Sequence, residues 1–156
     1  GGWSKGWAMT GWRLGWITGP TEVMDGVKVV NVSSATHVPT FLMPAAAKAL
    51  SLEEEVQEMK DAFAKRRVLM HQGLSSLPGF VVPEPEGAFY ILCDITGTGL
   101  TDIEFAHQAL EHAQVQVIPG SLMKGGDGLI RISYATSIAN IHEGVRRLRE
   151  WLESRS

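Results

Sequence analysis

Cysteine is scarce in this sequence: Cys93 is the only one among 156 residues. A disulfide needs two cysteines, so none can form within the chain, and this scarcity favours a reducing, cytoplasmic compartment. No apolar run approaches the roughly 20 residues that a membrane-spanning helix needs, and no signal peptide opens the chain. We therefore expect no membrane as a partner.

A large charge of one sign is also missing. The formal net charge is -3, so there is no basic excess of the kind that binds nucleic acid. Glu104, His107 and Glu111 share one face of an expected helix, but helical di-metal sites need matching copies on other helices. We expect no metal site. Apolar residues make up 44% and charged residues 20% of the chain, which is typical of an ordinary folded protein.

Hydrophobic patterning divides the chain into the ranges 1–50, 51–77 and 78–156. In the first range, the Gly/Trp-rich block predicts a strand or hairpin arm at residues 12–17, followed by helices at residues 21–30 and 45–50. The second range predicts one long helix, because Ser51 and Glu54 match a capping box and apolar residues recur at helical spacing. Pro78 and Gly79 end that helix.

The third range, 78–156, has the pattern of a small α/β unit. Strands are expected at residues 88–95, 114–118 and 129–134, and helices at residues 101–113 and 138–152. Thr101 with Glu104 forms the capping box of the first of these helices. In the last strand, Ile130, Ile132 and Tyr134 share one face, so Arg131 belongs to the opposite face.

Lys5 is the residue in the first block that is best suited to take part in a reaction. Trp3 and Trp7 flank it, and partial desolvation by tryptophan favours the neutral, nucleophilic amine. Arg13 lies eight residues further on, and its planar guanidinium suits a phosphate or carboxylate. The alternative is a purely structural lysine whose stem lies over the tryptophan rings. Spacing alone leaves both interpretations open.

The segment around Lys5 resembles the cofactor-lysine signature of class I/II aminotransferases, which are pyridoxal-phosphate (PLP)-dependent enzymes of fold type I, in the aspartate aminotransferase-like branch. The matching residues run Ser4-Lys5-Gly6-Trp7-Ala8-Met9-Thr10-Gly11-Trp12-Arg13-Leu14-Gly15. The resemblance implies that Lys5 is catalytic and binds PLP covalently, that Arg13 grips the cofactor phosphate, and that Ser4 belongs to the same cofactor site. Gly2 stands where the family often has a hydroxyl residue, which implies that phosphate contacts are fewer or come from elsewhere.

Three further segments resemble the same family, in the same order along the chain. Residues 85–90 resemble its Gly-x-Phe strand, and residues 117–120 resemble a strand-to-loop element near the site. Residues 131–135, Arg-Ile-Ser-Tyr-Ala, resemble the segment whose arginine binds the substrate α-carboxylate. The resemblance therefore assigns Arg131 to substrate binding. Without it, Arg131 would be taken for an outward-facing surface charge.

The resemblance implies an α/β fold that is the C-terminal part of a PLP-dependent transferase. Residues 1–50 would be the remnant of the large, PLP-binding domain, residues 51–77 the connecting helix, and residues 78–156 the small domain with a short mixed or antiparallel sheet. We expect a longer parent protein, a homodimer, that transfers an amino group between an amino acid and a 2-oxo acid.

The isolated chain should be inactive, because in the family the remaining cofactor contacts precede the lysine. Two alternatives stay open. One is a related PLP-dependent lyase or synthase of the same fold, and the other is a non-catalytic small α/β interaction module.

Overall fold

The computed structural model describes residues 1–155, which divide into two compact units. Unit 1 is Gly1–Met59 and unit 2 is Lys60–Ser156. The boundary falls inside helix α4, Glu53–Ser75. The long helix expected at residues 51–77 is therefore present, and it belongs partly to each unit.

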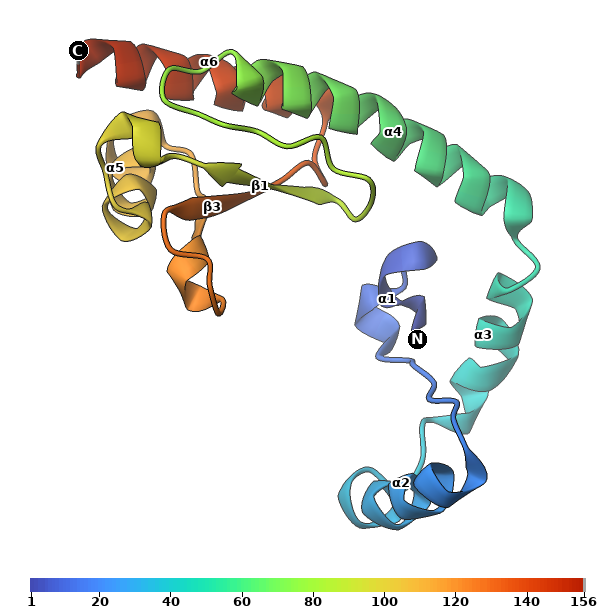
Figure 1. Ribbon diagram of the computed structural model, residues 1–156. Coiled ribbons are helices and arrows are strands. Elements are labelled where there is room, and N and C mark those ends of the chain that lie inside the picture. The colour runs from blue at the N-terminus through green and yellow to red at the C-terminus, as the bar shows by residue number, and fades with distance from the viewer. Residues whose placement is uncertain (156) are drawn as a thin grey trace. The chain divides into compact units, whose positions relative to one another are not determined.

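Unit 2 is a three-stranded antiparallel sheet covered by helices (Figure 1). The strands lie in the order β1 (Tyr90–Asp94), β3 (Leu129–Ser133), β2 (Ile118–Pro119). The helices are α5 (Asp102–Ala113), α6 (Ile138–Ser154) and the C-terminal part of α4, with single 3-10 turns η3 (Thr96–Thr98) and η4 (Gly120–Leu122). An α/β fold with a short antiparallel sheet is thus confirmed.

The core of unit 2 lies between one face of this sheet and the three helices. The expected alternation in β3 is confirmed, since Ile130, Ile132 and Tyr134 are all buried. They pack with buried residues of the helices, including Met70, Leu74, Phe105, Ile141, Leu148 and Trp151. Cys93 is fully buried in β1 as a small core residue. All three helices of unit 2 pack on this face, and on the opposite face Tyr90 and Leu92 are 36% and 37% exposed. That face, which carries no helix among the described residues of unit 2, is called the open face of the sheet.

Helix α4 approaches α6 closely at Gly73. A Cβ added there would lie 2.8 Å from Cγ2 of Val145, so only glycine fits without a shift. Arg149 of α6 adds two hydrogen bonds to Ser76, which follows α4, at 3.1 Å to the carbonyl oxygen and 2.6 Å to the hydroxyl. The two helices therefore form one layer of unit 2.

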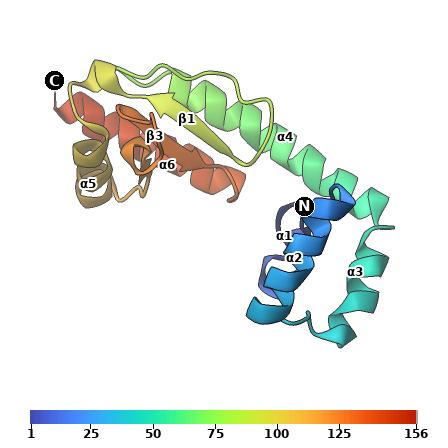
Figure 2. The same cartoon turned by 60° about the horizontal axis from the view of Figure 1, so that its bottom comes forward.

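Unit 1 is made of short helical elements and has little core. These elements are α1 (Trp3–Gly6), η1 (Thr10–Trp12), α2 (Thr21–Ser34), η2 (Thr40–Leu42) and α3 (Met43–Ala49), followed by the start of α4. Figure 2 shows α1, α2 and α3 as separate helices. Only Leu14, Ala46 and Ala49 are buried in this unit, and α2 has no buried residue at all.

Of two sequence-based expectations in unit 1, one is only partly met and the other is wrong. The strand or hairpin arm expected at residues 12–17 is reduced to an isolated antiparallel bridge between Gly15 and Gly2. It is shorter than expected because Thr10–Trp12 form a 3-10 turn and Arg13 takes a left-handed backbone with φ of 54°. The expected Ser51–Glu54 capping box is wrong, because α4 begins at Glu53 and Ser51 is not the residue directly before it. The Ser51 hydroxyl instead donates to the carbonyl oxygen of Lys48, near the end of α3, at 2.8 Å.

Two other boundaries differ from expectation for local reasons. The expected helix at residues 21–30 begins at Thr21, with Pro20 at the N-cap position, and continues to Ser34. The strand expected at residues 114–118 is reduced to Ile118–Pro119, because Gln114 adopts a left-handed conformation that caps α5. The Thr101–Glu104 capping box, by contrast, is confirmed with both of its reciprocal hydrogen bonds.

Candidate functional site

The first sixteen residues form a closed loop that carries Lys5. Gly1 and Trp16 exchange two hydrogen bonds, at 2.8 and 2.9 Å, and Gly2 pairs with Gly15 as an isolated antiparallel bridge. A Cβ on Gly15 would lie 3.1 Å from the carbonyl oxygen of Gly1, so the two ends of the loop approach closely because both are glycine-rich. The pairing of the two ends restricts the backbone of the residues that lie between them.

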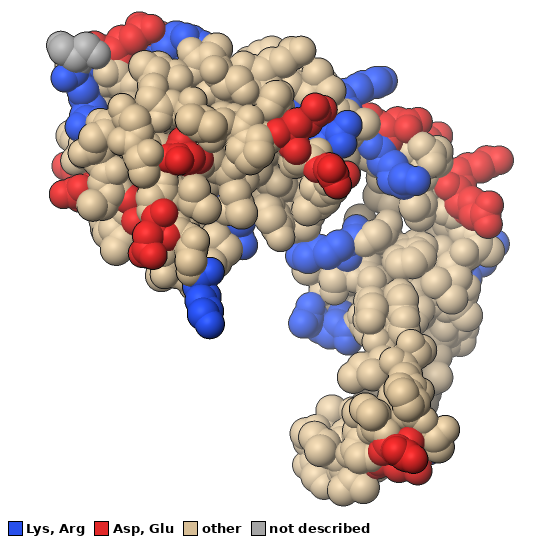
Figure 3. Space-filling view, in the orientation of Figure 1, with Lys and Arg blue, Asp and Glu red and all other residues tan. Residues whose placement is uncertain are grey.

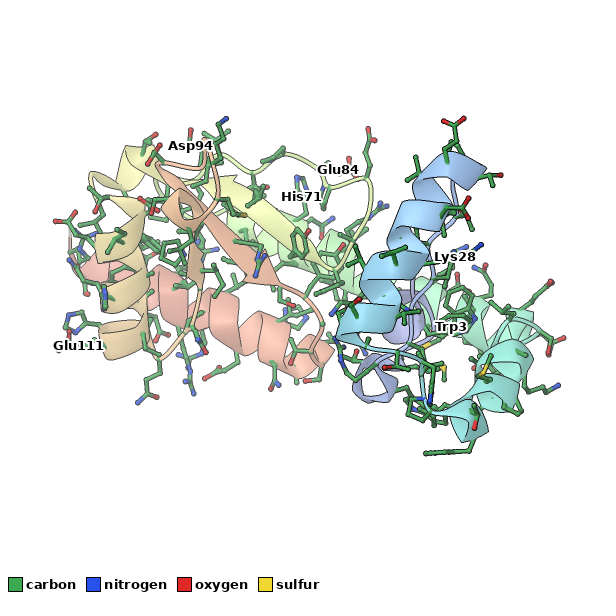
Figure 4. All side chains as sticks on the ribbon, turned by 90° about the horizontal axis from the view of Figure 1, so that it is seen from below. Trp3, Lys28, His71, Glu84, Asp94 and Glu111 are labelled. Carbon is green, nitrogen blue, oxygen red and sulfur yellow. The ribbon has the colours of Figure 1, made fainter. Side chains whose placement is uncertain are left out.

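A tryptophan cluster supports this loop from within. The rings of Trp3 and Trp16 meet edge to face with centroids 4.7 Å apart, and Trp7 lies 6.3 Å from Trp3 and 6.2 Å from Trp16. The indole N–H of Trp3, labelled in Figure 4, donates to the carbonyl oxygen of Ala46 in α3 at 3.0 Å. The tryptophans therefore pack on one another and anchor the loop to α3.

Lys5 lies on α1 and is exposed. The segment around it is fixed, because the Thr10 hydroxyl donates to the carbonyl oxygen of Ser4 at 2.7 Å. A primary amine on such a braced backbone can anchor a small molecule that carries an aldehyde.

Arg13 follows the 3-10 turn and is held by backbone geometry. Its left-handed conformation is uncommon for a residue with a side chain and costs on the order of 1 kcal/mol, and such strain is often found at functional sites. Its guanidinium donates one hydrogen bond to the carbonyl oxygen of Thr10, at 3.1 Å, and is otherwise exposed. Ser4, Lys5 and Arg13 all lie between the paired ends of the closed loop, Gly2 and Gly15. Within the loop, α1 and η1 are in contact.

Arg131 belongs to unit 2 and lies on the open face of the sheet. In the register of the sheet, Leu92 of β1 and Ile118 of β2 stand opposite it. Its guanidinium carbon lies 5.0 Å from the centroid of the Tyr90 ring. The three C-terminal segments singled out from the sequence, 85–90, 117–120 and 131–135, therefore meet around Arg131.

The segment that leads into β1 is braced by Tyr134. Its backbone N–H donates to the carbonyl oxygen of Phe89 at 2.9 Å, and its hydroxyl donates to the carbonyl oxygen of Ala88 at 3.0 Å. Burial raises the pKa of the Tyr134 hydroxyl, while the nearby Arg67 charge lowers it by a smaller amount. Arg67 also donates to the carbonyl oxygen of Pro85 at 3.1 Å. Residues 85–89 are thus tied to both α4 and β3.

The segment that contains β2 is fixed by Asp102 at the start of α5. This carboxylate is buried and accepts a hydrogen bond from the backbone N–H of Ser121 at 2.8 Å. Hydrogen bonding from Ser121 lowers the pKa of Asp102, against a smaller opposing effect of burial. This hydrogen bond between Asp102 and Ser121 is structural. It could not be predicted from the sequence, because the two residues belong to different elements.

The side chains of this chain fit two requirements of a phosphorylated aldehyde cofactor. A primary amine at Lys5 can bond an aldehyde carbon, and a guanidinium at Arg13 can bind a phosphate group. Within residues 1–155, no group of three or more His, Cys, Asp or Glu side chains is placed to hold a metal ion. None of the helices in that range combines the length and apolar character that crossing a bilayer requires.

Comparison with known proteins adds a family match over most of the chain. Residues 1–148 match the family model "Aminotransferase class I and II". An aspartate aminotransferase of Pyrococcus horikoshii is 40% identical over 154 residues, which are 96% of this chain and 39% of that protein. Aromatic-amino-acid aminotransferase 2 of Thermococcus litoralis is 39% identical, over 99% of this chain and 40% of its own length.

Solved structures agree with the sequence match. The crystal structure of an aromatic aminotransferase from Pyrococcus horikoshii OT3 superposes with a TM-score of 0.94 at 40% identity, over 99% of this chain and 42% of that one. The chain therefore spans about 40% of the length of the relatives it matches.

Proposed function

Because the chain belongs to the class I and II aminotransferase family, we propose that it provides the catalytic lysine and the substrate-binding arginine of a PLP-dependent aminotransferase. Lys5 is the proposed lysine and Arg131 the proposed arginine. The observation that carries the proposal is the segment from Ser4 to Arg13, which lies within the family match and forms one closed loop.

Each residue has a distinct chemical role in this proposal. The amine of Lys5 binds the cofactor and, once released, moves a proton to and from the substrate Cα as base and acid. Arg13 holds the cofactor phosphate, together with Ser4 in the same loop. Arg131 orients the α-carboxylate of the amino acid or 2-oxo acid substrate by two parallel N–H donors. PLP, when bound, supplies the electron sink for this chemistry.

The proposed place of the chain in a whole enzyme follows from its share of the relatives. We assign residues 1–50 to the large domain, residues 51–77 to the connecting helix and residues 78–156 to the small domain. Since relatives are about two and a half times as long, the remaining cofactor contacts would come from the part that precedes the lysine in them. We further propose a homodimer located in the cytoplasm, the latter because a single buried cysteine suits a reducing compartment.

The experiment that tests this function uses a fusion protein in which residues 1–156 replace the matching C-terminal part of the Pyrococcus horikoshii aspartate aminotransferase. Amino transfer from aspartate to a 2-oxo acid is measured in this fusion protein and in its Lys5→Ala variant. We expect turnover in the first and its loss in the second. The matched control is Lys48→Ala, which removes another exposed lysine of unit 1 and should leave turnover unchanged. Equal activity in the Lys5→Ala variant would refute the assignment.

A further inference from the structure

We propose that Tyr90 is a positioning residue for the reaction: its ring holds the guanidinium of Arg131 in the orientation that receives the substrate carboxylate. This inference rests on the proposed function of Arg131. The guanidinium carbon lies 5.0 Å from the centre of the Tyr90 ring, which is within the range of a cation–π contact. In the sheet register Tyr90 stands opposite Ser133, so it is the diagonal neighbour of Arg131 on the same face.

Arg131 needs such support because, within residues 1–155, no other side chain forms an ion pair or hydrogen bond with its charged end. Its direct partners across the strands, Leu92 and Ile118, are apolar. Among residues 1–155, no Asp or Glu forms an ion pair with it. A long arginine side chain without a partner samples many rotamers, and each must be restricted when a ligand binds. A ring under the guanidinium restricts them beforehand.

The contact with Tyr90 also leaves the N–H groups of the Arg131 guanidinium available for the substrate carboxylate. A guanidinium stacks on an aromatic ring through its flat face, whereas it binds a carboxylate through the N–H groups along its edge. The two contacts can therefore exist together, and the ring fixes the plane in which the N–H pair points. Tyr90 would increase the fraction of molecules that are ready to bind without itself touching the substrate.

Tyr90 is itself held firmly enough to act in this way. Its ring meets that of Phe89 edge to face, with centroids 5.3 Å apart and planes at 82°. The backbone just before it is fixed by the two hydrogen bonds from Tyr134 to Phe89 and Ala88. Ala88 has a left-handed φ of 64°, which turns the chain into β1. The position of the ring is thus set by its contact with Phe89 and by the backbone that the buried Tyr134 holds in place.

The kinetic test separates the ring from the hydroxyl in the fusion protein. Tyr90→Phe keeps the ring and should change KM for the amino acid by less than about two-fold, whereas Tyr90→Leu should raise KM about ten-fold with kcat nearly unchanged. A merely structural role would instead lower the yield of folded enzyme and leave KM alone. The matched control is Leu110→Ala, an exposed apolar residue on α5. If Tyr90→Leu does not fold, Tyr90→Val makes the same comparison.

A second readout needs no activity and uses the 156-residue chain itself. In its NMR spectrum the Cδ protons of Arg131 should be shifted upfield by the Tyr90 ring, equally so in Tyr90→Phe, and return to ordinary values in Tyr90→Leu. The same shifts in all three proteins would overturn the inference, as would an unchanged KM in Tyr90→Leu while Arg131→Lys is impaired. Unchanged kinetics in Arg131→Lys would remove the proposed function of Arg131 and this inference with it.

Discussion

Arg131 combines a charge with apolar neighbours, and its replacement by lysine tests whether its paired N–H donors bind the substrate. Lysine keeps the charge but loses the two parallel N–H donors of the guanidinium. In the fusion protein we expect Arg131→Lys to lower kcat/KM at least about 10-fold, equivalent to about 1.4 kcal/mol of transition-state stabilisation.

The control for this substitution is Arg146→Lys on α6, where the arginine only pairs with Glu143 and Glu150 at the surface. That variant should retain wild-type kinetics. If Arg131→Lys also retains them, Arg131 is a surface charge and not a substrate ligand.

Cys93 reports on whether the sheet of unit 2 is packed in solution. Burial raises the pKa of its thiol to about 12, and its exposed fraction is zero. Because only the thiolate reacts rapidly with alkylating reagents, iodoacetamide at pH 8 should leave the native chain unlabelled. In guanidinium chloride, labelling should reach one thiol per chain, as counted by mass spectrometry. Rapid labelling of the native chain would mean that β1 is not covered by the helices.

Helix α4 contributes to the core of unit 2 through one face of its last turns. Leu74 is fully buried, whereas Val68 on the same helix is 43% exposed. Leu74→Ala should lower the free energy of unfolding by about 2–5 kcal/mol, because it leaves a cavity among packed side chains. Val68→Ala should change it by less than about 0.5 kcal/mol. Urea denaturation followed by circular dichroism gives both values, and equal effects would place Leu74 outside the core.

The stability that the capping box of α5 contributes should depend on pH. The backbone N–H and the hydroxyl of Thr101 both donate to the Glu104 carboxylate, at 3.0 and 2.8 Å, and these hydrogen bonds lower the pKa of Glu104 in the folded chain. A carboxyl with a lower pKa when folded stabilises the fold above its unfolded pKa of about 4.3. That contribution is lost as the pH falls through the folded pKa.

Thr101→Ala should therefore cost about 1 kcal/mol of unfolding free energy at pH 7 and noticeably less at pH 3. Urea denaturation of both proteins at the two pH values measures the difference. A penalty that does not change with pH would mean that the Glu104 half of the box contributes nothing.

Elements whose signals are local were predicted well from the sequence. The helix at residues 138–152, the alternation in β3 and the Thr101 cap each depend on residues a few positions apart. The errors occurred where neighbouring elements compete for the same residue. Ser51 closes α3 instead of opening α4, and Gln114 extends the end of α5 at the expense of β2.

The residues of the candidate site also differ in how well they could be predicted from the sequence. Lys5 and Arg13 could be proposed because both lie in one short, recognisable segment. The contact between Tyr90 and Arg131 could not be predicted. It depends on the register between β1 and β3, and the sequence does not show the register of two residues that lie 41 positions apart.

On the scale of the whole molecule, the two units differ sharply in how well they bury apolar surface. Unit 2 contains one continuous core. Unit 1 leaves large apolar side chains in solvent, with Val29 69%, Val30 66% and Phe41 78% exposed. In Figure 3 the surface around α2 is largely uncharged apart from one acidic patch, whereas both signs are interspersed over unit 2. A helix of 14 residues that buries none of them is marginal in water.

The purified 156-residue chain should accordingly behave as two parts of unequal stability. In hydrogen–deuterium exchange, amides of β1 and β3 should be protected, while those of residues 21–34 should exchange quickly, since local stability follows buried contacts. The chain alone should bind PLP weakly and show no amino transfer, because the gain from a fixed cofactor geometry depends on contacts beyond these residues. Stoichiometric PLP with measurable turnover would show that the chain is sufficient by itself.

The identity of the cofactor lysine is the most direct test of the proposed function. The fusion protein loaded with PLP can be reduced with borohydride, which makes the bond between lysine and cofactor permanent, and then digested for peptide mapping by mass spectrometry. We expect the pyridoxyl group on Lys5, and no label there in the Lys5→Ala variant. A pyridoxyl group on any other lysine of an active enzyme would contradict the assignment of the site.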